Sequence, residues 1–393
     1  MKNYFLLTPY KQLQSQRHEE AISNFLLGPD NTGNVVYLEI IETIFGALPI
    51  HPAELLEYSK HLCESDSLLL LPWSNMICPD YSSELIDIII DLQIDVLPLS
   101  IGIQAPFESS PFSLQISPSS LKLLQYVSSR GRTPGVRGEI TQMILAGYGL
   151  KSIPIGCPSC LLLPIEEIAI SFSLIQHESV ENVRIGTNGT LSGLHRAETS
   201  ALLSWSQHMS CAYILQSESR IIADVYKVRY GKGLWNPAKC IVEAYKKDME
   251  NLLFDYGYYN QNPEEWGALR SFFMQKSHLF FDCASWKNHI RDNLDIVIGS
   301  RFHGNAIAML AGKPALCIPS DWRTYELCQF HSLPMIHVNS LPQLDSLISS
   351  VPFDLDKMTK AWSGAMAAFA HFLEANALPP VNLLRARIEP ARQ

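Results

Sequence analysis

Short apolar runs alternate with helical patterns along most of this 393-residue sequence. Each run is apolar at successive positions and ends in Gly, Pro or polar residues, which is typical of strands buried on both faces. Between the runs, apolar residues recur at helical spacing. Strands that alternate with helices predict parallel sheets covered by helices, so the chain is expected to belong to the α/β class.

The limits of the expected elements follow from these periods. Strands are expected at 67–73, 95–104, 124–130, 151–156, 182–186, 211–217, 278–283, 295–300, 314–320 and 334–338. Helices are expected at 34–48, 52–64, 82–93, 139–150, 237–255, 263–275, 304–311 and 354–378. The segment 162–181 has no clear period and is interpreted as a linker.

Two Rossmann-like domains that face a cleft are therefore predicted. We expect an N-terminal domain over 1–175, a C-terminal domain over 176–345 and a helical tail over 346–393. Ligands of such sheets gather at the carboxyl ends of the strands, where helix N-termini present free N–H groups. Candidate functional residues should therefore follow strands directly.

Composition narrows the class of partner. The net charge is −9 and 18% of residues are charged, so no overall basic field draws the chain to nucleic acid. No run reaches the ~20 apolar residues of a membrane span, and no secretory signal is evident, so a cytoplasmic protein is expected, with peripheral membrane contact left open. The oligomeric state is left open.

Nine cysteines are scattered along the chain without regular spacing. An odd, irregular set favours reduced thiols in the core. The one close pair, Cys157 and Cys160, leaves two alternatives open, a redox pair and half of a zinc site. No second pair or histidine cluster is spaced to complete a zinc site, so no metal is expected.

The turn at 299–305 combines a permanent cation with a titratable imidazole. Arg301 and His303 follow the expected strand, and Gly304 and Asn305 open the next helix. Free N–H groups at that helix start favour an anion, which Arg301 can hold through two hydrogen bonds. His303 can exchange a proton near neutral pH. The alternative is a carbonyl-capping arginine beside a core histidine.

Two further arginines are placed at helix starts. Arg323 follows the next expected strand and either faces the same cleft or pairs with Glu326 on the surface. Arg137 lies in "TPGVRGEI" and either meets an anion across the cleft or forms a surface ion pair with Glu139. Both are candidate anion-binding residues.

Amide side chains stand at several turns of the N-terminal part. Asn31, Asn34, Asn75 and Gln104 follow expected strands or open helices. Amides both donate and accept hydrogen bonds, which suits sugar hydroxyls. Turn and capping chemistry is the alternative, above all for Asn31 and Asn34 in "GPDNTGN".

The segment "DIVIGSRFHGNAIAMLAGKPALCIPSDWRTYEL" resembles the signature of the polysaccharide pyruvyl transferase family. That signature has a Ser-Arg-x-His-Gly turn, a helix of small residues, Gly-x-Pro, and a strand that leads into Asp-x-Arg-x-x-Glu. Four earlier segments are similar to the family pattern: "NTGNVV", "SIGIQA", "GVRGEITQMILAGYGL" and "IGCPSCLL". The resemblance spans about residues 30–340.

The resemblance implies a GT-B-like fold and transfer of the pyruvyl group of phosphoenolpyruvate to sugar hydroxyls of a surface polysaccharide or its precursor. It implies that His303 is the acid/base and Arg301 a donor-binding residue, with phosphoenolpyruvate as donor substrate and no cofactor. Gly304, Asn305, Arg323 and Arg137 are expected on the donor side, and the four amides on the acceptor side.

One position departs from the family pattern. Many members carry an arginine after the first strand of the second domain, whereas here Arg184 lies inside the strand and Asn188 occupies the turn. Asn188 is therefore a donor-side candidate, and Arg323 or Arg137 would compensate for the missing arginine. Two other functions stay open: a GT-B glycosyltransferase with a nucleotide-sugar donor, and a non-catalytic glycan-binding relative.

Overall fold

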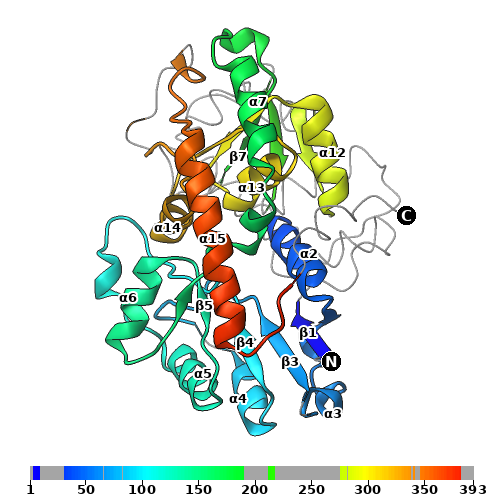
Figure 1. The fold of residues 1–393 in the computed structure, drawn as a ribbon, viewed down its shortest axis with the longest axis vertical. Helices are drawn as coiled ribbons and strands as arrows, with labels where there is room; N and C mark the ends of the chain where they lie inside the picture. Colours follow the sequence, from blue (N-terminus) through cyan, green and yellow to red (C-terminus); the bar gives the residue numbers. More distant parts are fainter. Residues whose placement is uncertain are drawn as a thin grey trace, which may run out of the picture.

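The computed structural model describes residues 3–8, 31–64, 66–81, 83–189, 211–216, 275–280, 282–337, 340 and 346–381. Two larger sheets, both parallel, follow one another along this part of the chain, with a small parallel pair of strands beside the first (Figure 1). We call the described residues 3–154 the first-sheet half and the described residues 185–337 the second-sheet half. The predicted α/β class, with parallel sheets covered by helices, is confirmed.

The first sheet has the strand order β2-β1-β3-β4. Its strands are β1 (Asn3–Leu7), β2 (Leu48–Ile50), β3 (Ser67–Leu71) and β4 (Val96–Pro98). All five residues of β3 are buried, as its continuous apolar run predicts. Beyond β4, the bridge from Ile101 to Val136 leads to a small parallel pair, β5 (Gly135–Val136) and β6 (Ile153–Pro154).

The second sheet has the strand order β11-β10-β7-β8-β9. Its strands are β7 (Ile185–Asn188), β8 (Ala212–Leu215), β9 (Ser277–Leu279), β10 (Ile296–Gly299) and β11 (Ala315–Cys317). β10 and β7 are paired so that Gly299 lies opposite Asn188. The ends of these two strands therefore meet at the same edge of the sheet.

Helices flank both sheets. In the first-sheet half they are α2 (Gly33–Phe45), α3 (Ser59–Leu62), α4 (Glu84–Asp91), α5 (Pro118–Ser129) and α6 (Glu139–Gly147). In the second-sheet half they are α12 (Cys283–Asn293), α13 (Phe302–Leu310) and α14 (Trp322–Phe330). Single 3-10 turns are η2 (Pro52–Glu54), η3 (Pro111–Ser113), η4 (Pro158–Leu162) and η5 (Val180–Asn182). Between the halves in sequence lies α7 (Ile165–Ile175), and α15 (Leu355–Ala375) follows both.

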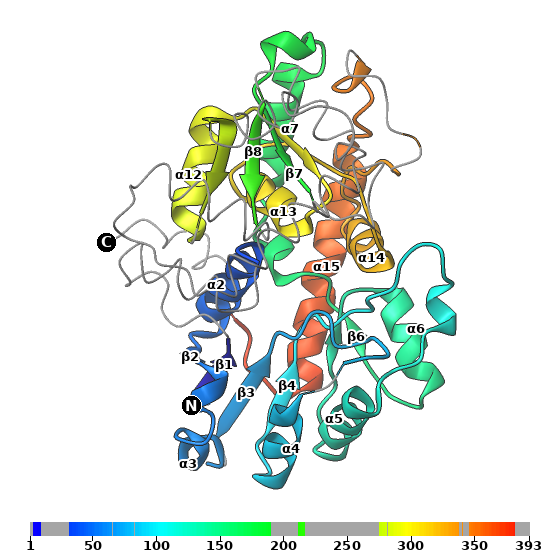
Figure 2. The same cartoon turned by 180° about the vertical axis from the view of Figure 1, so that it is seen from behind.

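Helix α2 joins the two halves through one continuous apolar core. Its buried face packs on α13 and α12 as well as on β1. The same core cluster contains Leu70 from the first sheet and Val297 from the second. Figures 1 and 2 show α2 between the two sheets in both views.

Helix α15 also spans the two halves. It contacts α7, η4 and β6, and both views show it running from the second sheet down to the first. Just past its end, Asn376 is buried and is hydrogen-bonded to both backbone polar groups of Thr133, at 2.9 Å from the N–H and 3.0 Å from the carbonyl oxygen. The residues after 345 were expected to form a helical tail, and α15 packs on β6 of the first-sheet half and on η4 and α7, which lie between the halves in sequence.

Several expected elements differ from the observed ones. The strand expected at 124–130 is wrong: these residues end α5, which begins after the Ser117 cap with Pro118 in its first turn. The linker expected at 162–181 contains α7, whose buried Ile165, Ile168, Phe172 and Ile175 recur at helical spacing. Exposed Ile170 and Leu174 on the other face obscure that period in the sequence.

Other expectations were incomplete. Strands β1 and β2 were not anticipated, and the helix expected at 52–64 is only η2 and α3. Of the strand expected at 334–338, residues 334–337 are described, and they form only a bridge from Met335 to Cys317. The helix expected at 237–255 and all but the last residue of that expected at 263–275 lie outside the described residues. Among the described helices, none combines the length and apolarity that crossing a bilayer requires.

Candidate active site

The turn from β10 to α13 is fixed by two buried asparagines. Asn188, at the end of β7, accepts a hydrogen bond from the Arg301 N–H (3.0 Å) and donates one to Asn305 Oδ1 (3.1 Å). Asn305 donates in turn to the Gly299 carbonyl oxygen (2.7 Å). These bonds tie the two strand ends to the first turn of α13, and so fix the position from which Arg301 and His303 project.

Close approach explains the two glycines of this turn. A Cβ on Gly299 would lie 2.0 Å from the backbone oxygen of Asn188, and one on Gly304 would lie 2.8 Å from the Asn188 amide carbon. Neither position has room for a side chain. The glycines therefore let β7, β10 and α13 meet closely enough for the asparagine bonds to form.

His303 is buried, with 8% of its surface exposed. Its ring stacks on Tyr37 of α2, with 4.8 Å between ring centroids and 19° between planes. The Tyr37 hydroxyl donates to the Pro72 carbonyl oxygen at 2.8 Å, which fixes the phenol ring. The Cys157 thiol lies 3.8 Å from His303 Nε2. The imidazole thus contacts residues from two separate segments, and a third segment fixes the tyrosine.

Arginines from both halves approach this imidazole. Arg137, just before α6, is 3% exposed and donates from Nε to the Ser100 carbonyl oxygen (3.1 Å). Arg323, in the first turn of α14, donates to Asn75 Oδ1 and lies 3.3 Å from a carboxylate oxygen of Asp321. Ser100 has a left-handed backbone (φ 53°), which is the kind of strain found at functional sites.

Like charges and burial shape the electrostatics of the site. Burial, Arg137 and Arg323 hold the pKa of His303 well below its ordinary value, so its imidazole is neutral at neutral pH. Burial and the charge of Arg323 lower the pKa of Arg137 to about 10, which still leaves it a cation. Burial alone would raise the pKa of Asp321, but Arg323 and the Thr324 N–H bring it below its ordinary value.

The starts of four helices carry the residues of this site. Arg301 precedes α13, Arg323 lies at the start of α14, Arg137 lies two residues before α6, and Tyr37 is in the first turns of α2. A Cβ on Gly33, the first residue of α2, would lie 3.2 Å from the Cβ of His303. Helix N-termini carry partial positive charge, so they add to the field of the arginines. The arrangement suits a small, multiply charged anion.

The expected amides are placed differently from one another. Asn31 accepts from the Gly33 N–H at 2.9 Å, as turn chemistry predicts, and lies at the start of α2 beside His303. Asn34 is half-buried in the first turn of the same helix. Asn75 meets Arg323. Gln104 is exposed. The structure brings Asn31 near His303 and Asn75 to Arg323.

Sequence reasoning missed Tyr37 and Thr141, and treated Cys157 only as a thiol. Tyr37 has no signal in the sequence beyond its place in an apolar helix. Cys157 and Cys160 are both buried free thiols, as the scattered cysteines predicted, and burial raises the pKa of each. Glu326 was considered as the last residue of the Asp-x-Arg-x-x-Glu signature and as a surface partner of Arg323, but it is 2% exposed and binds Thr141.

A family model described as "Polysaccharide pyruvyl transferase" matches residues 31–321. The chain belongs to this family. The match begins at the asparagine that opens the α2 turn and ends at Asp321, so it covers the turn at 299–305 and the Arg137 segment. A search of curated proteins gives no match.

Solved structures resemble this pyruvyl transferase family member only distantly. A Methanocaldococcus jannaschii UDP-GlcNAc 2-epimerase matches at 11% identity and a TM-score of 0.34, covering 90% of this chain and 76% of its own. The S. aureus protein MnaA, solved with UDP, matches at 10% and 0.40, covering 97% and 99%. A Burkholderia vietnamiensis trehalose-phosphate synthase matches at 10% and 0.37, covering 93% and 81%. Likenesses of this size carry no argument about the substrate.

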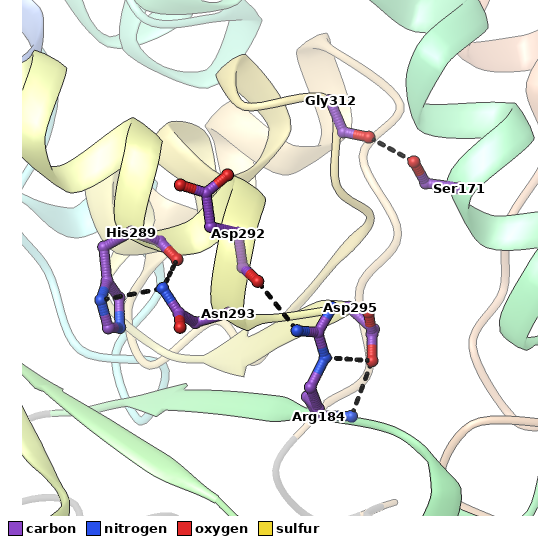
Figure 3. A network of polar contacts seen from close by, with 7 residues as sticks. All are labelled: Ser171, Arg184, His289, Asp292, Asn293, Asp295 and Gly312. Atoms are coloured by element: carbon purple, nitrogen blue, oxygen red, sulfur yellow. Dashed lines mark hydrogen bonds and ion pairs between the residues drawn. The ribbon is translucent and has the colours of Figure 1, made fainter.

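Asn188, expected in the turn, is the last residue of β7, and Arg184, expected inside that strand, immediately precedes it and is engaged away from the turn. Its guanidinium binds the Asp295 carboxylate (2.7 and 3.1 Å) and the Asp292 carbonyl oxygen (2.8 Å), as Figure 3 shows. Asp295 precedes β10, whereas His303 follows it. Arg184 therefore lies at the opposite end of the strands from His303.

No group of three or more His, Cys, Asp or Glu side chains in the described part of the chain is arranged to hold a metal ion.

Proposed function

We propose that this chain transfers the pyruvyl group of phosphoenolpyruvate to sugar hydroxyls of a surface polysaccharide or its precursor, with release of phosphate. The observation that supports the proposal is the buried, neutral His303 with Arg137 and Arg323 near it and Arg301 at the start of its helix. Phosphoenolpyruvate carries a carboxylate and a phosphate on one small carbon skeleton. Several cations and helix N-termini around one proton-transfer group match that ligand.

The chemistry requires one proton donor and several cations. A proton moves to the methylene carbon of the donor, so the double bond opens and positive charge develops at C2. A sugar oxygen forms a bond to C2 and loses its proton, and the C2–O bond to phosphate breaks. If a second hydroxyl then takes the place of phosphate, the product is a pyruvate ketal.

His303 is proposed as the group that moves these protons. In the resting site its imidazole is neutral because burial disfavours the charged form and the two arginines repel a further positive charge, which together hold its pKa well below the ordinary value. A bound donor brings negative charge that offsets both arginines, so the imidazole can accept a proton and then act as the acid. The arginines in turn stabilise the charge that builds on the leaving phosphate.

The remaining site residues are proposed in two groups. On the donor side, Arg301, Arg137 and Arg323 bind the anion, Gly304 leaves space for it, and Asn188 and Asn305 hold the turn. The acceptor-side group consists of Asn31, Asn34, Asn75 and Gln104. Of these, Asn75 contacts Arg323, so the two groups adjoin.

Ligand-induced stabilisation tests the donor. Unfolding of the full chain is followed with phosphoenolpyruvate or with a nucleotide sugar, and a ligand at 100 times its Kd adds ~2.7 kcal/mol. We expect stabilisation by phosphoenolpyruvate that is lost in Arg301→Ala. Stabilisation by nucleotide sugars alone would instead favour a glycosyltransferase.

Phosphate release tests catalysis. Wild-type chain with phosphoenolpyruvate and a glycan acceptor should release inorganic phosphate, and His303→Ala should release ~10²–10⁴ times less while remaining folded. Donor binding without phosphate release, over a panel of glycans, would point to a non-catalytic relative.

A further inference from the structure

A buried carboxylate joins the two halves next to the arginines. Glu326 lies in the middle of α14 and is 2% exposed. Its Oε1 accepts from the Thr141 N–H at 2.6 Å and its Oε2 accepts from the Thr141 hydroxyl at 2.7 Å. Glu326 belongs to the second-sheet half and Thr141 to the first turn of α6 in the first-sheet half. The carboxylate therefore uses both oxygens in one contact between the halves.

Glu326 takes the place of the missing cap of α6. The N-cap residue of this helix is Gly138, which has no side chain to accept from the free N–H groups of the first turn. The backbone of Gly138 is extended (φ −176°), so its conformation does not require glycine. Space does, because a Cβ there would lie 2.4 Å from Glu326 Cγ. Gly138 therefore provides no cap of its own, and its lack of a side chain leaves the space that Glu326 occupies.

The same contact is close to both arginines in sequence and in space. Arg323 precedes Glu326 by one helical turn of α14, and Arg137 directly precedes Gly138. Thr141 also accepts from the Ile103 N–H at 3.3 Å. The neighbouring residue, Gly102, leaves space for the Arg137 stem, since a Cβ there would lie 2.6 Å from Arg137 Cδ. The segments that hold Arg137 are thus tied through Thr141 to Glu326.

The two cations repel each other, and the Asp321 carboxylate, 3.3 Å from Arg323, offsets part of that repulsion. After burial, the charge of Arg323 is the next cause of the lowered pKa of Arg137, which shows that the two guanidinium groups are close enough to repel each other. Holding them together without a ligand requires a fixed framework. The Glu326–Thr141 contact supplies one that links the helix of one arginine to the turn of the other.

We propose that Glu326 is a positioning residue that sets the spacing between Arg137 and Arg323, so that one ligand with two anionic groups can bind both. The proposal rests on the proposed function for the identity of that ligand. It does not require Glu326 to touch the substrate. A ligand with a single small anionic centre, which one arginine can hold, should depend on Glu326 much less.

Isothermal titration of the full chain with phosphoenolpyruvate, pyrophosphate and inorganic phosphate tests this. In Glu326→Ala we expect the Kd of the two larger ligands to rise about tenfold or more and that of inorganic phosphate to stay within about twofold. Thr141→Val removes one of the two hydrogen bonds at nearly constant volume. It should raise the Kd of phosphoenolpyruvate and pyrophosphate relative to that of inorganic phosphate by a smaller factor. It serves as the second variant where Glu326→Ala does not fold.

Two controls separate positioning from general stability. Asn376→Ala removes another buried contact between α15 and the first-sheet half, so it should lower the melting temperature without changing the ratio of affinities. In an Arg137→Ala background, Glu326→Ala should add no further loss of pyrophosphate affinity, because the group it positions is gone. Additive losses, or equal weakening of all three ligands in Glu326→Ala, would overturn the proposal.

The pyrophosphate arm also distinguishes this proposal from the proposed function. If wild-type chain binds pyrophosphate in the expected Glu326-dependent way but does not bind phosphoenolpyruvate, the positioning role stands and the donor assignment falls. If phosphoenolpyruvate binds with unchanged affinity in Glu326→Ala, the donor assignment stands and the positioning role falls.

Discussion

The Tyr37 ring lies nearly parallel to the His303 imidazole, at 4.8 Å between centroids, although the residues come from helices 266 positions apart in the chain. Tyr37 is in α2, which packs on both sheets, and His303 is in the first turn of α13. The stacking therefore sets the orientation of the imidazole plane from outside its own helix. If His303 transfers protons as proposed, Tyr37 contributes by fixing the orientation of the imidazole rather than by chemistry of its own.

Removing the Tyr37 ring should reduce turnover more than stability. In Tyr37→Leu the imidazole loses the surface that fixes its plane, and a misplaced catalytic group costs roughly 10–100-fold in rate. Tyr37→Phe keeps the ring but loses the bond to the Pro72 carbonyl oxygen, so it should cost about 1 kcal/mol of stability and little turnover. Phosphate release and chemical denaturation measure the two effects. Equal turnover in the two variants would contradict the orienting role.

Donor binding should be accompanied by proton uptake. Arg137 and Arg323 help to keep the pKa of His303 low. The negative charge of a bound donor offsets these two positive charges, so binding raises the pKa of His303 toward its ordinary value. Titration with phosphoenolpyruvate at pH 6 in buffers of different ionisation enthalpy should give different observed heats. The difference should disappear in His303→Gln. Heats independent of the buffer at every pH from 5.5 to 7 would exclude this coupling.

Replacing Arg137 by methionine should stabilise the free protein while abolishing donor binding. Arg137 is buried with Arg323 as a neighbouring like charge, and apolar replacements of buried charges are often neutral or stabilising by 1–4 kcal/mol. We expect a free energy of unfolding higher by about 1 kcal/mol, since the lost bond to the Ser100 carbonyl oxygen offsets part of the gain. Phosphoenolpyruvate should no longer stabilise the variant. A less stable variant would show that Arg137 has a structural role.

Acid should destabilise the fold through buried neutral histidines. Burial lowers the pKa of His331 to about 3, and its Nε2 accepts from the Cys157 N–H at 3.0 Å. The unfolded chain takes up this proton below pH ~6.5 whereas the folded chain does not, so stability is complete above pH 6.5 and falls as the pH drops toward 3. The loss is about 1.4 kcal/mol per pH unit for each such group.

Denaturation at pH 7 and pH 5 measures this loss, and His331→Gln is the matched variant. It should be less stable than wild type at pH 7 but lose less on acidification. His303 adds to the slope in the same direction because its pKa is lowered as well. An unchanged slope in His331→Gln would show that His331 does not carry the effect.

Local patterns were sufficient for the α/β class and for the turn at 299–305. Strands β3 and β10 are short runs buried on both faces, which is the pattern of a parallel sheet. Arg, His and Gly directly after a strand indicate an anion-binding turn. The pattern was insufficient where an element depends on the other half. The first turn of α6 has no local cap signal because its cap is Glu326, 185 residues away.

The same limit applies to the site. The position of Arg301 and His303 between β10 and the first turn of α13 could be predicted because they follow their strand directly. The contact of Tyr37 with His303 could not, since it depends on the packing of α2 on α13. Arg323 had two interpretations, and the partner considered for it, Glu326, turns the other way into the core. Sequence spacing predicts on which face of its helix a residue lies, but it does not predict which residues of the other half pack against that face.

The Asn376–Thr133 bonds connect residues 243 positions apart. During synthesis, the segment 132–133 therefore leaves the ribosome long before its partner exists, and every strand of the second sheet is made in the interval. Contacts between residues so far apart in sequence form slowly, so the first-sheet half remains without its contact to Asn376 until synthesis is nearly complete. We expect nascent chains that stop short of α15 to depend on chaperones far more than the finished protein does.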